Sequence, residues 1–562
     1  MSMKIFLAQQ NYQIGHIEYN TQKILDAISQ ADVAGADLVV FSELSVCGYP
    51  PRDFLYFNDF ILKCEAAVSR IAQHAPHLGV LIGAPQRNPV VMGKDLFNAA
   101  WFLHEGGVKQ VVHKSCLPTY DVFDEDRYFE PAREWNVIEF KGKRLAVTVC
   151  EDIWNLGNNP KYRYCPMDLL MQQHPDVMIN LSASPFDYTH DEDRKATVKA
   201  NVLKYNLPMF YCNAVGSQTE IVFDGTSLVF DKQANLCASM KRFEEDYRLF
   251  ELQEDGTILG EILEPAARVP DEELDPVMFN PALHIHSVYQ ALITGIKDYF
   301  QKMGFSKAIL GSSGGIDSAV TLVLACEALG AENVTAVLMP SPYSSSHSVD
   351  DAVQLSRNLN NPYHVLSIQP VYESFLNTLD PLFKDLPFNV AEENIQSRTR
   401  GNLLMAIANK FNYILLNTSN KSELATGYGT LYGDMAGGIS VLGDCYKTQV
   451  YALAAYINRE REIIPLHIIQ KAPSAELRPN QKDSDSLPEY DTLDAILYQY
   501  IERTQGPQEI KAMGFDEALV NKTLGMVNRN EYKRNQFCPI IRISPKAFGV
   551  GRRMPIVEKY LS

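Results

Sequence analysis

The stretch Ala308–Val320, with the sequence AILGSSGGIDSAV, constrains the fold of this chain more than any other. A short apolar run is followed by a loop of glycines and serines, and then by a segment that begins like a helix. Glycine lets a backbone approach an anion closely, and a helix N-terminus adds unpaired N–H groups and a favourable dipole. The pattern therefore predicts a strand, an anion-binding turn and a helix in an α/β domain.

The chemistry of this loop favours nucleotide phosphates. Serine hydroxyls can donate to phosphate oxygens, and Asp317 can hold a divalent cation that bridges them. A Walker P-loop is excluded, because no lysine stands where G-x-x-x-x-G-K-[ST] requires it. The segment Ser313–Ser318, SGGIDS, resembles the S-G-G-x-D-S loop of the ATP pyrophosphatase family, which adenylates an oxygen and releases pyrophosphate. A Gly/Ser turn that merely caps a helix is the alternative.

Length and composition bound the class of protein. A chain of 562 residues suggests two large domains or several ordinary ones, and 46% apolar residues allow an ample core. The net charge of −17 argues against a nucleic-acid surface, although a nucleotide could still bind in a locally positive cleft. The ten cysteines form no C-x-x-C pair, so we expect reduced thiols, no zinc site and a cytoplasmic protein. No signal peptide or membrane span is predicted.

The first half of the chain alternates short apolar runs with helical patterns. The predicted strands are Lys4–Gln9, Asp37–Ser42, Val80–Gly83, Ala99–Leu103, Val108–Val112, Arg144–Val149, Val177–Leu181, Met209–Ala214 and Ser227–Phe230. The predicted helices include Asn20–Ala34, Phe60–His74 and Thr197–Tyr205. This alternation predicts a layered α/β domain, with two sheets face to face between helices.

Three of these strands are followed directly by reactive side chains, Glu43, Lys114 and Cys150. Loops beyond strand ends are where α/β proteins usually assemble their sites. A carboxylate can take the thiol proton, and an ammonium can stabilise both the thiolate and a developing oxyanion. The three residues together are therefore candidates for nucleophilic catalysis, whereas a cysteine alone would fit a buried structural thiol.

Residues 3–235 resemble the nitrilase superfamily, whose amidases use a Glu-Lys-Cys triad. The resemblance rests on FSELSVCGYP, on LPTY after the lysine, and on CEDIW. It implies an α-β-β-α sandwich with Glu43 as general base, Lys114 as support for the oxyanion and Cys150 as nucleophile. Glu125 could match a second glutamate of the family that orients the site, although its acidic neighbours also fit a solvated loop.

The closer resemblance of this half is to the glutaminase half of the glutamine-dependent NAD synthetase family. It implies that Tyr120 and Ser184 contact the glutamine substrate. Six positions after that serine, where the family usually has Lys or Arg, this chain has His190. A neutral histidine can hydrogen-bond but supplies no fixed charge near pH 7, so we expect altered glutamine affinity or pH dependence.

Residues 250–281 are acidic and contain several prolines, and strand periodicity stops there. We therefore predict a first domain over residues 1–265, a linker over residues 266–285 and a second domain over residues 286–562. The second domain begins with a predicted helix, His286–Gly304. With the predicted strands Val334–Met339 and Tyr363–Ser367 it indicates a doubly wound parallel sheet.

Later segments of the second domain resemble further blocks of the NAD synthetases. Asn417–Glu423, NTSNKSE, matches the block N-T-[ST]-N-x-[ST]-E, although it could also be an N-capped helix start. The resemblance implies Mg²⁺ on Asp317 and Glu423. The implied ATP contacts are Gly311, Ser312, Ser313, Gly314, Gly315, Ile316, Asp317, Ser318, Thr418 and Lys447. The implied deamido-NAD contacts are Asn394, Glu423, Asp434 and Lys533. Solvated charges are the alternative for Asp434, Lys447 and Lys533.

The resemblance covers nearly the whole chain and implies ATP-dependent amidation of deamido-NAD to NAD, with ammonia from glutamine. Free ammonia is mostly protonated at neutral pH and an acyl-adenylate is open to water, so we expect enclosed transfer through a tunnel. The expected partners are these small molecules and further copies of the chain, and neither nucleic acid nor membrane. A glutamine-fed enzyme of the GMP-synthetase kind and a non-catalytic scaffold with both folds remain as alternatives.

Overall fold

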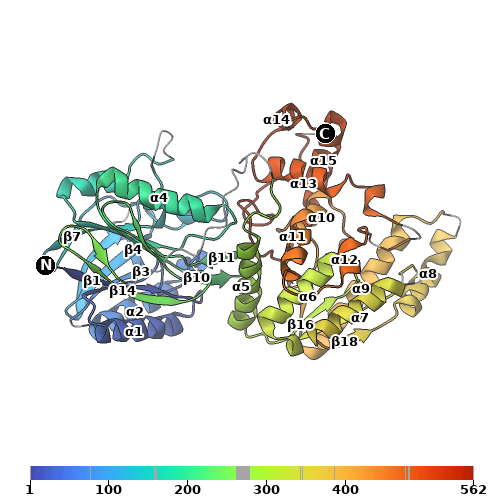
Figure 1. The fold of residues 1–562 in the computed structure, drawn as a ribbon, viewed down its shortest axis with the longest axis horizontal. Coiled ribbons are helices and arrows are strands. Elements are labelled where there is room, and N and C mark those ends of the chain that lie inside the picture. Colours follow the sequence, from blue (N-terminus) through green and yellow to red (C-terminus); the bar gives the residue numbers. More distant parts are fainter. Residues whose placement is uncertain are drawn as a thin grey trace. The chain divides into compact units, whose positions relative to one another are not determined.

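The structure is a computed structural model (Figure 1) that describes residues 2–75, 77–90, 92–156, 161–260, 279–341, 343–344, 346–384, 386–474, 476–478 and 481–560. The chain divides into two compact units, Met1–Glu272 and Glu273–Ser562. Of the predicted linker, residues 266–285, only residues 279–285 are among the described residues. Among the helices described, none is long and apolar enough to cross a membrane.

Two β-sheets form the centre of the first unit, in the orders β15-β14-β1-β2-β3-β4-β5 and β13-β12-β9-β8-β7-β6. Their strands are β1 (Met3–Gln9), β2 (Leu38–Val40), β3 (Gly79–Arg87), β4 (Leu96–His104), β5 (Gly107–His113), β6 (Ile138–Phe140), β7 (Lys143–Val149), β8 (Val177–Ser182), β9 (Met209–Asn213), β12 (Leu228–Phe230), β13 (Leu236–Ser239), β14 (Asp246–Leu252) and β15 (Ile258–Leu259). The central strands β1, β2 and β3 are parallel, as are β7, β8 and β9. A separate hairpin joins β10 (Val215–Gln218) to β11 (Ile221–Asp224).

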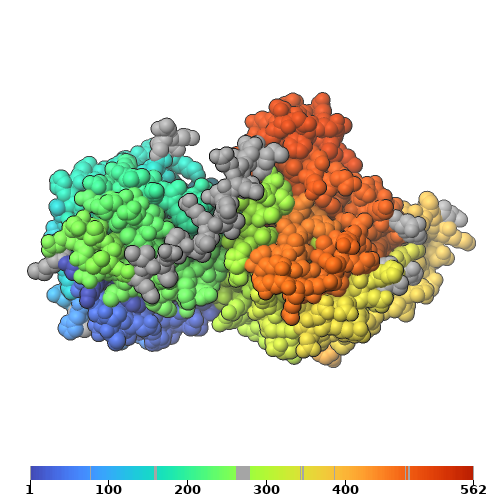
Figure 2. All heavy atoms as spheres, viewed as in Figure 1, coloured from blue at the N-terminus to red at the C-terminus, as the bar shows by residue number. Residues whose placement is uncertain are grey.

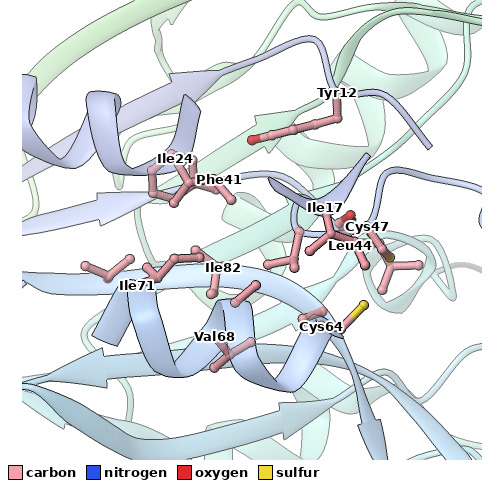
Figure 3. Packing of buried hydrophobic residues seen from close by; sticks show 14 of the residues in the cluster. Tyr12, Ile17, Ile24, Phe41, Leu44, Cys47, Cys64, Val68, Ile71 and Ile82 are labelled. Atoms are coloured by element: carbon pink, nitrogen blue, oxygen red, sulfur yellow. Dashed lines mark hydrogen bonds between the residues drawn. The ribbon is translucent and has the colours of Figure 1, made fainter. Parts of the chain in front are cut away.

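Helices cover the outer faces of both sheets (Figure 1). They are α1 (Ile17–Val33), α2 (Asn58–His74), α3 (Pro166–Leu170) and α4 (His190–Tyr205), with short 3₁₀ turns η1 (Arg52–Tyr56), η2 (Glu125–Arg127), η3 (Cys150–Ile153) and η4 (Met171–Gln173). Apolar side chains of the two sheets share one core, α1 and α2 share a second with the first sheet, and α3 and α4 share a third with the other sheet. Figure 3 shows the second core, with Ile24, Val68 and Ile82 packed together. This layering confirms the predicted α-β-β-α sandwich.

The main departure from the predicted elements is the start of α4, at His190 rather than Thr197. The apolar pattern that predicted the helix begins only at Val198, which is the first buried apolar residue of α4. The first turn carries three acidic residues instead, Asp191, Glu192 and Asp193. Carboxylates at a helix N-terminus are stabilised by the helix dipole, so this turn forms without an apolar face.

The second unit contains one five-stranded sheet in the order β18-β17-β16-β19-β20, with every pair parallel. Its strands are β16 (Ala308–Gly311), β17 (Val334–Leu338), β18 (Tyr363–Val365), β19 (Ile414–Asn417) and β20 (Ile439–Ser440). The helices are α5 (Ile285–Met303), α6 (Ile316–Leu329), α7 (Ser346–Leu359), α8 (Gln369–Phe383), α9 (Val390–Phe411), α10 (Lys421–Thr426), α11 (Lys447–Ile457), α12 (Leu466–Gln470), α13 (Tyr490–Ile501), α14 (Pro507–Ala512), α15 (Glu517–Arg529) and α16 (Glu531–Arg534), with η5 (Ala331–Asn333) and η6 (Asp483–Asp485). The order, with β16 at the centre, confirms the predicted doubly wound sheet.

The loop between β16 and α6 requires glycine at its tightest point. Gly314 has a φ of +77°, and a Cβ built on it would lie 2.2 Å from the carbonyl oxygen of Ser348. No side chain fits that space, so any other residue would push the loop away from α7. The helix then begins at Ile316, directly after the loop.

A buried ion pair holds α4 to β11 in the first unit. Arg194 and Asp224 are both fully buried, with Nη2 and Oδ1 2.9 Å apart. Arg194→Met should lower the free energy of unfolding by about 3–5 kcal/mol, because it strips a buried carboxylate of its closest cation. The three tryptophans, Trp101, Trp135 and Trp154, all lie in the first unit, so denaturant unfolding followed by their fluorescence reports on that unit.

The control for this measurement is Lys63→Ala, which breaks an exposed ion pair with Asp59 on α2. An exposed pair contributes little, so this change should alter the free energy by less than about 0.5 kcal/mol. Equal effects of the two substitutions would contradict the role given to the buried pair.

Candidate active sites

The three predicted catalytic residues of the first unit follow strand ends, as expected. Glu43 comes three residues after β2, Lys114 directly after β5, and Cys150 directly after β7. Cys150 is the first residue of η3 and has a φ of +44°, in the left-handed region that residues other than glycine rarely adopt. A strained backbone of this kind at a strand end presents a nucleophile in a fixed direction.

The centre of this site is the fully buried ammonium of Lys114. Its Nζ lies 2.8 Å from Glu43 Oε1 and 2.8 Å from Glu125 Oε1. Asn98 Nδ2 donates to the same two carboxylates, at 2.7 and 3.2 Å. Burial disfavours a charged lysine, but the two carboxylates outweigh it and hold the pKa of Lys114 well above its usual range. Lys114 is therefore a permanent cation.

Burial raises the pKa of two other groups in the site, the Glu125 carboxyl and the Cys150 thiol. Burial raises the pKa of Glu125 to about 7, an effect that Lys114 opposes and Glu43 reinforces. Burial and then the charge of Glu43 also raise the pKa of the Cys150 thiol, against the attraction of Lys114. Cys150 is thus a protonated thiol at rest and needs a base to become a nucleophile.

The predicted glutamine contacts form two separate pairs. The Tyr120 hydroxyl lies 2.9 Å from each carboxylate oxygen of Glu151, to which it donates. Glu151 is the residue that follows Cys150 in the chain. Ser184 Oγ lies 2.9 Å from His190 Nε2, and the His190 ring stacks on Trp154 with centroids 4.9 Å apart. The first pair lies beside Cys150, because Glu151 follows it in the chain. The second pair lies near Glu43, because the N–H of Ala183, which precedes Ser184, donates to Glu43 Oε2 at 3.1 Å.

Four further residues, which were not predicted, help to build this site: Asn98, Tyr49, Glu151 and Asp152. Tyr49 donates to Glu125 Oε1 at 2.8 Å, in addition to the contacts of Asn98. Asp152 accepts backbone N–H groups from Ser115, Cys116 and Val149 at 2.8–3.0 Å, which ties the loops of Lys114 and Cys150 together. The acids in CEDIW could have drawn attention, but no local signal marks Asn98.

A cavity of the second unit lies at the carboxyl ends of β16, β17 and β19. Most of the predicted ATP and deamido-NAD contacts line it, namely Gly311, Ser312, Ser313, Gly315, Ile316, Asp317, Ser318, Thr418, Glu423, Asp434 and Lys447. Three predicted residues, Gly314, Asn394 and Lys533, are not among its lining residues. Gly314 instead packs beneath the loop against Ser348, as described above.

The charges of this cavity gather around the buried ammonium of Lys447. Its Nζ lies 2.5 Å from Asp317 Oδ2 and 3.9 Å from Glu423 Oε1. Burial opposes its charge, but Asp317 and Glu423 outweigh that effect and raise the pKa of Lys447. Asn420 holds both acids, because its side-chain amide donates to Asp317 and its backbone N–H donates to Glu423. The segment Asn417–Glu423, NTSNKSE, therefore contacts Asp317 through Asn420.

The predicted dinucleotide contacts other than Glu423 gather at a neighbouring turn, residues 427–434. Asp434 accepts the N–H of Thr430 at 2.6 Å, and Asn394 accepts its hydroxyl at 2.8 Å. Lys533 donates to the carbonyls of Gly427 and Gly429, at 2.8 Å each. These three residues therefore define a second region that borders the phosphate loop through Asp434.

Four further charged residues line the cavity without being among the predicted contacts, namely Arg400, Lys471, Glu476 and Asp483. Asp483 is buried and accepts the Tyr490 hydroxyl at 2.9 Å, and burial raises its pKa. The polar sequence around Asp483 predicts a mobile loop at residues 484–486, and Asp483–Asp485 form the short turn η6. That this loop is mobile stays a prediction. No hydrophobic pattern distinguishes this wall of the cavity from a surface loop.

Known proteins match both halves of this arrangement. The carbon-nitrogen hydrolase family model matches residues 4–258, and the NAD synthase family model matches residues 288–537. A glutamine-dependent NAD(+) synthetase from Synechocystis sp. is 43% identical and one from Thermotoga maritima 40%, each alignment covering 99% of both chains. The solved structure of the Acinetobacter baumannii enzyme in complex with ADP matches with a TM-score of 0.77, 38% identity and 99% coverage of both chains. This chain therefore belongs to the glutamine-dependent NAD(+) synthetase family.

Proposed function

We propose that Glu43, Lys114 and Cys150 hydrolyse glutamine, and that the cavity around Lys447 activates the nicotinate carboxylate. The reaction of the family is the amidation of deamido-NAD to NAD, with ammonia from glutamine and with ATP split into AMP and pyrophosphate. The observation that carries the assignment of the first site is the position of the Lys114 ammonium, 2.8 Å from both Glu43 and Glu125.

In the glutaminase half, Cys150 attacks the amide carbon of glutamine while Glu43 takes the thiol proton. Lys114 stabilises the developing oxyanion, and the proton held by Glu43 passes to the departing ammonia. The resulting thioester is then cleaved by water, which releases glutamate and restores the thiol. Tyr120, Ser184 and His190 are proposed to bind the amino-acid end of glutamine. Tyr120 donates to Glu151, the neighbour of Cys150, and Ser184 follows Ala183, whose N–H donates to Glu43 Oε2 at 3.1 Å. His190 is in contact with Ser184.

In the synthetase half, the loop Gly311–Ser318 and Thr418 are proposed to bind the phosphates of ATP. The nicotinate carboxylate attacks the α-phosphate and pyrophosphate leaves; ammonia then attacks the acyl-adenylate and AMP leaves. Lys447 is proposed to neutralise phosphate charge, because its buried ammonium lines the same cavity as the loop Gly311–Ser318. Asn394, Glu423, Asp434 and Lys533 are proposed to bind deamido-NAD.

The residues of the cavity also fit a Mg²⁺ ion. Asp317 and Glu423 are hard oxygen donors that meet at one ammonium, and phosphate oxygens usually supply much of the remaining coordination. We propose that these two carboxylates are the protein's ligands to the ion. When bound, Mg²⁺ would supply charge neutralisation at the phosphates.

We further propose that ammonia passes directly from the glutaminase half to the synthetase half, because free ammonia would be protonated and the acyl-adenylate hydrolysed. We also propose a homo-oligomer. Support comes from a run of exposed apolar side chains along and after α8, namely Leu382, Leu386, Phe388 and Val390. Helix α8 and the start of α9 belong to the yellow to light-orange part of the second unit in Figure 2. A patch of this kind is typical of an interface. A cytoplasmic location remains a prediction of the sequence.

The variant Cys150→Ala tests the triad. Glutamine-dependent NAD formation should fall at least about 10³-fold, because no other group replaces the nucleophile. With ammonium chloride as nitrogen source the rate should stay at the wild-type level, since the synthetase half is untouched. Cys237→Ala, on β13, is the matched control and should keep both activities. Glutamine-dependent activity in Cys150→Ala would show that the triad is wrongly assigned.

The pH dependence of glutamine hydrolysis tests Glu125. Because its pKa is raised to about 7, lowering the pH through that value protonates it and takes one carboxylate from Lys114. We expect kcat/KM to fall on the acid side of about pH 7. Glu125→Gln imitates the protonated form, so it should lower kcat/KM about tenfold and remove that acid limb. His190→Gln should keep the limb; a limb that disappears in His190→Gln instead would assign it to the histidine.

The variant Lys447→Met tests the second site. It should lower kcat/KM for ATP at least about 100-fold with ammonium chloride, because phosphate charge is no longer neutralised. Glutamine hydrolysis measured in the same preparation should persist. Lys410→Met, at an exposed position of α9, should leave both activities unchanged. Unchanged ATP kinetics in Lys447→Met would remove this lysine from the proposed site.

A further inference from the structure

A segment beyond the residues matched by the NAD synthase family model reaches the core of the second unit. The model match ends at residue 537, and residues 539–546, here called the strap, follow directly. The strap runs beside β20: Ser440 donates its N–H to the carbonyl of Pro539, and Ile541 donates to the carbonyl of Ser440. Ile541, Ile543 and Ser544 are fully buried. The strap is thus an interior element of this unit.

The strap ends at a closed network of buried polar groups. Asp444 Oδ2 accepts the backbone N–H groups of Ile543 and Ser544, at 2.7 Å each, and its Oδ1 accepts the Ser544 hydroxyl at 2.7 Å. Lys421 Nζ donates to Ser544 Oγ at 2.8 Å and to the carbonyl of Lys546 at 3.0 Å. Lys421 and Asp444 are themselves paired at 2.9 Å. The Ser544 hydroxyl therefore accepts from the buried Lys421 ammonium and donates to the buried Asp444 carboxylate, which also contact each other.

The two partners of Ser544 each precede a charged residue of the proposed ATP site. Lys421 opens α10 two residues before Glu423, and Asp444 lies three residues before Lys447 at the start of α11. The two segments also contact each other, because Ser422 Oγ accepts the backbone N–H of Lys447 at 2.9 Å. The network under the strap thus fixes the starts of the two helices whose first residues surround Asp317.

We propose that Ser544 is a positioning residue for the binding of ATP and Mg²⁺, acting through Lys421 and Asp444 on Glu423 and Lys447. The strap sets the distance between the carboxylate and the ammonium that face the phosphates. Small displacements of such groups are costly, since a misplacement of about 1 Å can reduce a rate by about 100-fold. This inference rests on the proposed roles of Glu423 and Lys447.

The test uses the full chain with ammonium chloride as nitrogen source. In Ser544→Ala the KM for ATP and the Mg²⁺ concentration for half-maximal rate should both rise about tenfold. Glutamine hydrolysis should stay at the wild-type rate. A purely structural role would lower the fraction of active enzyme and hence the maximal rate, and would leave both concentrations unchanged. Ser356→Ala, at an equally buried serine of α7 outside the cavity, is the matched control and should change neither.

A second variant keeps the proposal testable if Ser544→Ala does not fold. Asp444→Asn preserves shape but removes one of the two carboxylate charges that pair with Lys421, the other being Glu502 at 2.6 Å, and it should produce the same rise in both concentrations. Wild-type values in the folded variants would overturn the proposal. Lys447→Met separates this outcome from failure of the proposed site: weakened ATP use in Lys447→Met with wild-type kinetics in Ser544→Ala would reject the strap's role alone.

Discussion

Each of the two sites depends on one buried ammonium that is shared by two carboxylates. Lys114 lies between Glu43 and Glu125, and Lys447 lies between Asp317 and Glu423. A charge removed from water is tolerated only when its partners are close and well oriented, so the surrounding loops must hold these acids in place. Much of the remaining polar structure, such as Asn98 in one unit and Asn420 in the other, serves that requirement.

The fold could be predicted well from the sequence because most strands are short apolar runs between helical patterns. The layering of sheets between helices follows from burying both faces of those strands, whereas the order of the strands in each sheet was not predicted. The start of α4 could not be predicted, since its first turn is stabilised by acidic side chains and carries no apolar pattern. The predicted start of this helix was therefore wrong because charged side chains, and not buried apolar ones, determine where α4 begins.

The site residues that motifs could identify are those at strand ends, where chemistry and chain order coincide. Lys114 and Asp317 are of this kind, and the resemblance to two families supplied their roles. Asn98 and Asp483 were missed because Asn98 is 55 residues from its partner Glu43 and Asp483 lines the same cavity as the distant loop Gly311–Ser318. Neither residue type is unusual at its position. Ser544 is the extreme case, because its partner Lys421 lies more than a hundred residues earlier in the chain. Such contacts follow from topology, which residue patterns do not encode.

Asp152 gives the proposed glutaminase site a property that Glu43, Lys114 and Cys150 alone would lack. One carboxylate receives N–H groups from the loop after Lys114 and from the strand end that carries Cys150. The lysine loop and the cysteine loop therefore share a common anchor. Since Lys114 is also held by Glu43 and Glu125, the spacing of thiol and ammonium depends on Asp152 and on these acids together. Loss of the Asp152 carboxylate would free three backbone N–H groups in two loops at once.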